Sequence, residues 1–279
     1  MVIDFHTHVF PDKIAERTVR ALEINGNAKA HSDGTAAGLL DCLRQAEADI
    51  AVNLPVLTSP TQFDSITRFA GELNSREYSD AKIISFSGMH PDCEDVEEKL
   101  ARLRELGFLG IKIHPDYQQT FIDDPRYVRI LECAKALGLI VVTHAGQDGA
   151  YVGQPIKCTP RRVLNLLDRI GGYSKLVLAH VGGNEMYDDV YSLLAGEDVY
   201  FDTSLCLRDV GEYSFKRLLD KHGDGRILFA TDSPWRDISE EIGIVKSYNL
   251  GQDTEKKMFS ENAKLLLGIQ DKQNGDSND

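Results

Sequence analysis

Short runs of apolar residues recur along the whole chain, and amphipathic stretches separate one run from the next. Several runs consist almost entirely of Val, Ile and Leu, which is typical of strands buried on both faces of a parallel sheet. The pattern predicts eight such strands, over residues 2–8, 50–56, 83–90, 110–115, 140–145, 176–181, 199–203 and 227–231.

Helical patterns fill the intervals between these strands. Apolar residues at helical spacing, together with start and stop signals, predict helices over residues 11–23, 38–48, 65–74, 96–106, 125–137, 160–170, 187–195, 215–222 and 239–248. A capping segment is expected over residues 253–267. Eight strands that alternate with helices, in a chain of 279 residues, predict a single-domain α/β protein with a (β/α)8 TIM barrel.

The competing architecture is an open, doubly wound sheet. We favour the barrel because polar, chemically capable residues follow strands from both ends of the sequence. A closed barrel places the first strand beside the eighth, which an open sheet usually does not. The barrel domain is expected to cover residues 1–270. Residues 271–279, DKQNGDSND, are polar and are expected to form a disordered tail.

The first strand carries the most informative motif, His6-Thr7-His8. Residues two apart on a strand point to the same face, so the two imidazoles are expected to converge, with Asp4 beside them. Two neutral imidazoles side by side suit a transition-metal ion such as zinc.

Later strands end in similar residues. Lys112 and His114 close the fourth predicted strand, His144 the fifth and His180 the sixth, and Asp232 follows the eighth. In a barrel all of these positions open on one face, where the catalytic residues of this fold gather. Any one of these histidines is explained equally well as a buried, hydrogen-bonded core residue, but that explanation fits the set poorly.

The segments VIDFHTHVFP, IKIHP, VVTHAG, LAHVGG and ILFATDSPW, in this order, resemble the amidohydrolase superfamily. The most similar branch is the amidohydrolase-2 group, which includes aminocarboxymuconate-semialdehyde decarboxylase-like proteins. The resemblance implies one divalent metal ion, Zn²⁺ with Mn²⁺ as the alternative, bound by His6, His8, His144 and Asp232. It also implies that His180 acts beside the metal as a catalytic base or polariser.

Lys112 is open to several interpretations. Binuclear members of the superfamily have a carboxylated lysine at this position, which bridges two metals. The alternative that we favour is an inward-facing cation that binds a substrate carboxylate or phosphate, with His114 on the same face. A lysine that faces outward to the helices is the third interpretation. Trp235, three residues after Asp232, is a further candidate for substrate binding.

The net charge of −13, from 44 acidic and 31 basic residues, argues against a nucleic-acid or anionic-membrane partner. A small-molecule substrate is expected, and Lys112 favours an anionic one. The odd number of five cysteines, without a CxxC motif, and the lack of a signal peptide or a membrane-spanning run predict a cytoplasmic protein. Homodimerisation is implied by the resemblance alone.

The favoured reaction is hydrolysis of a small amide, ester or lactone by metal-activated water. In this scheme Asp232 accepts the water proton, and the metal and His180 stabilise the oxyanion. The alternative is non-oxidative decarboxylation of a small unsaturated or aromatic carboxylic acid, since the ligand set does not separate the two. A non-catalytic barrel that binds a ligand or a partner protein is the third hypothesis.

Overall fold

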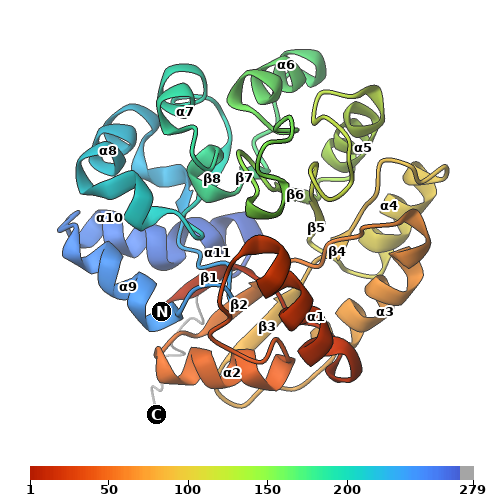
Figure 1. Cartoon of the computed structure of the whole chain (residues 1–279), viewed down its shortest axis with the longest axis horizontal. Helices are drawn as coiled ribbons and strands as arrows, with labels where there is room; N and C mark the ends of the chain where they lie inside the picture. Colours follow the sequence, from red (N-terminus) through yellow and green to blue (C-terminus); the bar gives the residue numbers. More distant parts are fainter. Residues whose placement is uncertain (271–279) are drawn as a thin grey trace, which may run out of the picture.

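The computed structural model describes residues 1–270, and these residues form a TIM barrel, as predicted (Figure 1). The strands are β1 (Ile3–Thr7), β2 (Ile50–Asn53), β3 (Lys82–Ser85), β4 (Ser87–Gly88), β5 (Gly110–Ile113), β6 (Ile140–Thr143), β7 (Leu176–Leu178), β8 (Tyr200–Asp202) and β9 (Ile227–Leu228). Every paired strand is parallel to its neighbour and follows it in chain order. Phe86 separates β3 from β4, so these two correspond to one predicted strand.

The barrel closes between its first and last strands. The Phe5 N–H group donates to the Phe229 carbonyl (2.9 Å), and the Asp232 N–H group donates to the His6 carbonyl (2.8 Å). A parallel bridge between Thr7 and Ser233 continues this contact beyond β9. The closure therefore brings the end of β1 against the segment that carries Asp232.

Helices surround the strands in Figure 1. They are α1 (Asp12–Gly26), α2 (Ala36–Gln45), α3 (Phe63–Asn74), α4 (Val96–Glu105), α5 (Pro125–Ala136), α6 (Pro160–Ile170), α7 (Tyr187–Leu193), α8 (Leu207–His222), α9 (Ile238–Ser247), α10 (Gln252–Lys256) and α11 (Asn262–Leu267). Short turns are η1 (Pro60–Gln62), η2 (Gly149–Tyr151), η3 (His180–Gly182) and η4 (Asp224–Arg226), and the π turn η5 (Lys257–Glu261) joins α10 to α11. Within residues 1–270 no helix has the length and apolar character needed to cross a bilayer.

The main differences from the predicted elements lie at their ends. Most strands end earlier than expected, and the residues that follow them, among them His8, His114, His144 and Asp232, belong to the loops. Helix α8 begins at Leu207 rather than at residue 215, and Gly211, with φ of 71°, interrupts its helical backbone and hides the pattern. The tail predicted over residues 271–279 lies outside the described residues.

Two apolar layers hold the barrel together. Inside the ring of strands, Phe5 and Phe86 pack edge to face with ring centroids 6.1 Å apart. Leu266 and Leu267 of α11 belong to the same buried cluster as these residues, so α11 caps the barrel interior. A larger cluster fills the space between the strands and the outer helices.

Strand β1 contains a bulge that re-aims its side chains. Between the pairs Asp4–Ala51 and Thr7–Asn53, β1 has two residues and β2 has one. Strict alternation, which would place Asp4 beside His6 and His8, therefore fails here. The Asp4 carboxylate instead accepts hydrogen bonds from the Thr231 hydroxyl (2.6 Å) and the Thr231 N–H group (3.0 Å).

Helix α1 crosses the open end of the barrel. It follows β1, yet it contacts η2, which follows β6 on the opposite side of the ring. The approach is close, because a Cβ atom added to Gly149 would lie 3.1 Å from the Gly26 carbonyl oxygen. In Figure 1, α1 lies inside the ring of outer helices. It buries only Ala15 and Val19, so it is packed more lightly than the outer helix α6, which buries five residues.

Candidate active site

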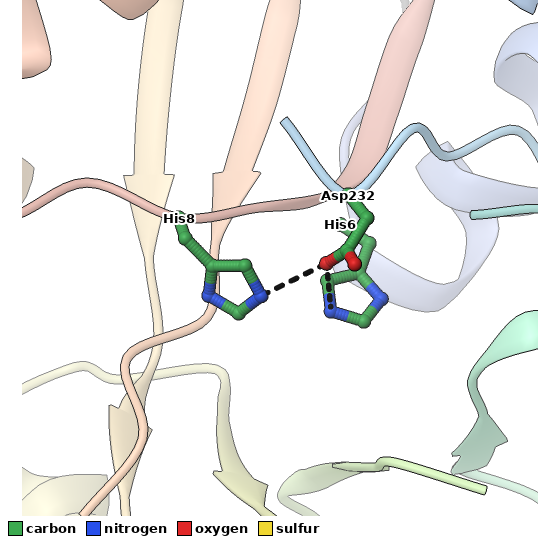
Figure 2. A group of neighbouring side chains, drawn as sticks. All are labelled: His6, His8 and Asp232. Atoms are coloured by element: carbon green, nitrogen blue, oxygen red, sulfur yellow. Dashed lines mark hydrogen bonds and ion pairs between the residues drawn. The ribbon is translucent and has the colours of Figure 1, made fainter. Parts of the chain in front are cut away.

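His6, His8 and Asp232 come together at the end of β1 (Figure 2). The Oδ1 atom of Asp232 lies 3.3 Å from His6 Nε2 and 3.0 Å from His8 Nε2. Barrel closure explains the convergence, because the backbone of Asp232 is hydrogen-bonded to that of His6. Burial alone would raise the pKa of Asp232, but the neighbouring His6 and His8 hold it below its usual range.

These three side chains fit a divalent metal ion. Ligand atoms about 2.0–2.1 Å from a tetrahedral ion lie about 3.3 Å from one another, close to the separations seen here. Two imidazole nitrogens and a carboxylate oxygen are also the ligand types of catalytic zinc sites. The geometry of the chain's own residues is thus compatible with an ion held by this group.

Asp202, at the end of β8, holds the His6 ring through Nδ1, the ring nitrogen that does not face Asp232. Its Oδ2 atom accepts a hydrogen bond from His6 Nδ1 (2.8 Å), which leaves the lone pair on His6 Nε2. Asp202 is fully buried, and although burial opposes ionisation, His6 keeps the pKa of this carboxyl well below its usual range. Asp202 was not among the site residues predicted from the sequence. It ends an apolar strand, and the same feature, an aspartate after an apolar strand, led to the prediction of Asp232.

Lys112, on β5, lies against the group formed by His6, His8 and Asp232. Its Nζ atom is 3.0 Å from His6 Nε2, and its side chain is 1% exposed. The structure therefore places Lys112 inside the barrel and not toward the helices. Burial lowers the pKa of Lys112 to about 8, although the nearby Asp202 and Asp232 raise it. Burial and the Lys112 charge lower the pKa of His6 to about 4.

His144 and His180 form a second pair on the β6 and β7 side. His180 Nε2 lies 3.0 Å from His144 Nδ1, and His180 Nδ1 lies 3.0 Å from the Ser204 carbonyl. The His180 ring stacks 5.6 Å from that of His6, so His180 connects the pair to the group of His6, His8 and Asp232. His144 does not belong to that group, and its role as a metal ligand stays a prediction.

The remaining predicted site residues lie at the rim. His114 stacks on His144 with ring centroids 4.3 Å apart and planes 12° from parallel. Its Nε2 atom is 3.4 Å from Asp148 Oδ2, and Tyr117 packs edge-on against its ring. Trp235 is partly buried, and its backbone N–H group donates to the Asp232 carbonyl (2.9 Å). No strong signal in the sequence marked Asp148, which lies in the loop after β6.

The arrangement combines three side chains that could hold a cation, a buried lysine and several buried imidazoles. Because these groups are buried, their charges are weakly screened and act strongly on any bound molecule.

Comparisons with known proteins agree with this picture. The model of the amidohydrolase family matches residues 3–269. No curated protein sequence matches the chain. One similar solved structure is 2,6-dihydroxybenzoate decarboxylase from Rhizobium, at 15% identity and a TM-score of 0.67 over 96% of this chain and 98% of that one.

A second is 5-carboxyvanillate decarboxylase from Novosphingobium aromaticivorans, complexed with manganese and 4-hydroxy-3-methoxy-5-nitrobenzoic acid. It has 15% identity and a TM-score of 0.70 over 96% of both chains. A third is a probable 2-pyrone-4,6-dicarboxylic acid hydrolase from Acinetobacter baumannii with bound citric acid, at 16% identity and a TM-score of 0.67 over 96% of this chain and 99% of that one. At these identities the likeness shows the shared fold.

Proposed function

Because this chain belongs to the amidohydrolase family and is an enzyme, we propose that it removes CO₂ non-oxidatively from a small unsaturated or aromatic carboxylic acid. The observation that carries this proposal is the buried Lys112 ammonium group, 3.0 Å from His6 Nε2. A buried cation at this point suits an anionic substrate, whereas a neutral amide or ester has no need of it. Two of the similar structures are decarboxylases of aromatic acids, which supports the choice.

The divalent ion would be held by His6, His8 and Asp232, with His144 as the expected fourth ligand. When bound, the ion acts as a Lewis acid that withdraws electron density from a substrate oxygen. Imidazole and carboxylate ligands accept either Zn²⁺ or Mn²⁺, and one similar decarboxylase was solved with manganese. Asp202 holds the His6 ring in the orientation that this binding needs.

The protein's own groups then supply binding and proton transfer. Lys112 binds an anionic oxygen of the substrate and orients its carboxylate in a site of low polarity. The bond between the carboxylate carbon and its neighbouring carbon breaks, CO₂ leaves, and the electron pair stays on the neighbouring carbon. His180 is assigned as the donor that protonates this carbon. Its Nδ1–H group donates to the Ser204 carbonyl, so the proton that moves is a second one, carried on Nε2, which faces His144 inside the site. Nε2 takes this proton from water before each turnover and is left with its lone pair after the transfer.

Hydrolysis of a small amide, ester or lactone is the second candidate. The pKa of Asp232 is held low by its two histidine neighbours, so its carboxylate is available to accept a proton from water. In this scheme His180 stabilises the oxyanion of the tetrahedral intermediate. The likeness to a probable 2-pyrone-4,6-dicarboxylic acid hydrolase keeps this reaction in consideration.

A product assay separates the two reactions. Enzyme loaded with Zn²⁺ or Mn²⁺ is incubated with hydroxybenzoates and unsaturated acids, and in parallel with lactones, esters and amides. We expect equal amounts of CO₂ and decarboxylated product from at least one acid, and loss of this activity in His180→Asn. His31→Asn, a change at an exposed histidine, is the matched control. New carboxylate or amine without CO₂ would instead identify a hydrolase.

A further inference from the structure

A second polar cluster lies on the far side of His144 from His180. One ring nitrogen each of His114 and His144 and a carboxylate oxygen of Asp148 lie within 4.8 Å of one another. Neither the bound ion nor the proton transfer described above uses Asp148. The cluster therefore needs an explanation of its own.

Hydrogen bonding in the cluster is incomplete. His144 Nδ1 faces His180, but His144 Nε2 is buried and has no partner among the described residues. His144 Nδ1 presents its lone pair when it binds an ion, or when His180 carries a hydrogen on both ring nitrogens and donates from Nε2. In either case His144 Nε2 carries the hydrogen. A buried N–H group without an acceptor is unfavourable, so an oxygen atom of a bound molecule is expected there.

Asp148 offers the complementary group. Its Oδ1 atom accepts a hydrogen bond from the Ala150 N–H group (2.8 Å), which caps η2. Its Oδ2 atom lies 3.4 Å from His114 Nε2, which is longer than a good hydrogen bond. This oxygen therefore keeps the capacity to accept a hydrogen bond from a bound molecule.

The geometry fits a hydroxyl group better than a second metal ion. The His114 and His144 rings are stacked within 12° of parallel, so the lone pairs of their nitrogens cannot point at one ion. A single hydroxyl oxygen with two hydrogen bonds of about 2.8 Å at the tetrahedral angle needs partners about 4.6 Å apart. The atoms of the cluster lie within 4.8 Å of one another, so the cluster has room for such a group.

We propose that His144 and Asp148, with His114 beside them, form a subsite that recognises a hydroxyl group of the substrate. The hydroxyl oxygen accepts a hydrogen bond from His144 Nε2–H, and the hydroxyl hydrogen is donated to Asp148 Oδ2. A carboxylate in this place would be repelled by Asp148, and an ammonium group has no lone pair for His144. The inference deepens the proposed function, on which it rests, and narrows the substrate class to hydroxylated carboxylic acids.

The walls around the cluster are aromatic. The Tyr117 ring packs edge-on against the His114 ring, with ring centroids 4.3 Å apart. Tyr151 of η2 packs edge-on against Tyr117, with ring centroids 5.5 Å apart. Helix α1 holds η2 from the opposite side of the barrel. A planar substrate that carries a hydroxyl group would therefore meet apolar surface beside the polar pair. A site built for a hydroxyl group discriminates strongly against the analogue that lacks it, because its polar groups are then left unpaired.

Binding measurements with Asp148→Asn test the subsite. The asparagine oxygen can still cap η2, but the second carboxylate oxygen becomes an NH₂ donor. Calorimetry on metal-loaded enzyme compares benzoate with 2-, 3- and 4-hydroxybenzoate. In the parent, one hydroxy isomer should bind roughly tenfold more tightly than benzoate, and Asp148→Asn should lose most of that ratio. Asp124→Asn, which also replaces a helix-capping aspartate, is the matched control and should keep it.

The proposal is overturned if no hydroxy isomer binds more tightly than benzoate, or if Asp148→Asn keeps the parent ratio. A crystal structure of the parent with the preferred isomer is a second readout that does not depend on the variant's folding. It should show the hydroxyl oxygen about 3 Å from both Asp148 Oδ2 and His144 Nε2; a hydroxyl group bound elsewhere would refute the subsite. Because binding is scored, a preference for the hydroxyl without CO₂ release would leave the subsite standing and remove only the proposed reaction.

Discussion

The Asp202 carboxylate accepts a 2.8 Å hydrogen bond from His6 Nδ1, on the edge of the imidazole that faces away from Asp232. One residue thus sets both the tautomer and the direction of a proposed metal ligand. Ser204 extends this support, because its hydroxyl group lies 3.1 Å from His6 Nδ1 and 3.0 Å from His180 Nδ1. Residues at and just after the end of β8 therefore hold the His6 and His180 rings in position, although none of them is a proposed metal ligand.

Asp202→Asn should weaken metal binding without unfolding the protein. The asparagine can no longer offer the same charged acceptor to His6, and loss of such a partner typically lowers metal affinity about 10–100-fold. Competition with a chromogenic chelator measures the effect. Asp198→Asn, a change at an exposed residue that pairs with Arg226, is the control and should leave the affinity as in the parent. Equal affinities in both variants would show that Asp202 does not orient His6.

Lys112→Met separates the two roles considered for this lysine. If Lys112 binds the substrate anion, turnover should fall at least about 100-fold while metal binding is kept or tightened, because Lys112 no longer shares the His6 lone pair. If a carboxylated Lys112 is a metal ligand, the variant should lose metal. Metal content and turnover are measured on the same preparation. Lys216→Met, at a partly exposed lysine paired with Glu212, is the control.

Glu241 should make the protein less stable as the pH rises from about 4.5 to 7. This side chain is 1% exposed, and burial raises its pKa from 4.5 to about 7, against the opposing effect of Arg236. In that range the folded chain keeps the proton and the unfolded chain loses it, so each step up in pH favours unfolding. Below pH 4.5 both states are protonated, and above pH 7 both are ionised, so the dependence ends at either side.

Glu241→Gln should therefore remove this contribution: relative to the parent, its free energy of unfolding should rise with pH and be higher by roughly 2 kcal/mol at pH 7.5. Urea unfolding at pH 4.5, 6 and 7.5 measures it. Glu240→Gln, a change at the exposed neighbour that pairs with Arg208, should keep the parent profile. The difference between variant and parent is scored, because buried His6, whose pKa is lowered to about 4, acts in the opposite sense in both proteins. A Glu241→Gln profile that stays parallel to that of the parent from pH 4.5 to 7.5 would contradict the assignment.

Gly146 should be far less tolerant of alanine than Gly153 in the same loop. Both have positive φ, 86° and 82°. A Cβ atom at Gly146 would lie 2.1 Å from the Asn184 backbone nitrogen, whereas nothing lies within 4 Å at Gly153. We expect Gly146→Ala to cost roughly 3 kcal/mol and Gly153→Ala about 1 kcal/mol. Thermal unfolding compares the two, and equal losses would show that the backbone contact near His144 is not tight.

Much of the fold and part of the site could be predicted from residue patterns. Alternation of apolar strands with helices predicted the barrel, and the polar residue at each strand end predicted where His6, His8 and Asp232 meet. Alternation placed Lys112 and His114 on one face of their strand but left open whether that face looks inward. The structure settles it, because Ile111 and Ile113 pack outward against the helices. These features depend on local periodicity, which the sequence records directly.

Other features depend on contacts between distant segments. The bulge in β1 between Asp4 and Thr7 is visible only in the pairing of this strand with β2. The path of α1 across the barrel mouth is set by its contact with η2, more than 100 residues away in the chain. Asp148 lies in a loop without periodicity, and only its distance to His114 marks it as a site residue.

Anomalous diffraction from crystals of active, metal-loaded enzyme tests the central claim most directly. The account predicts a peak about 2.0–2.2 Å from His6 Nε2, His8 Nε2 and an Asp232 carboxylate oxygen. A peak elsewhere in the barrel, or active enzyme with no ion bound by these three residues, would contradict it.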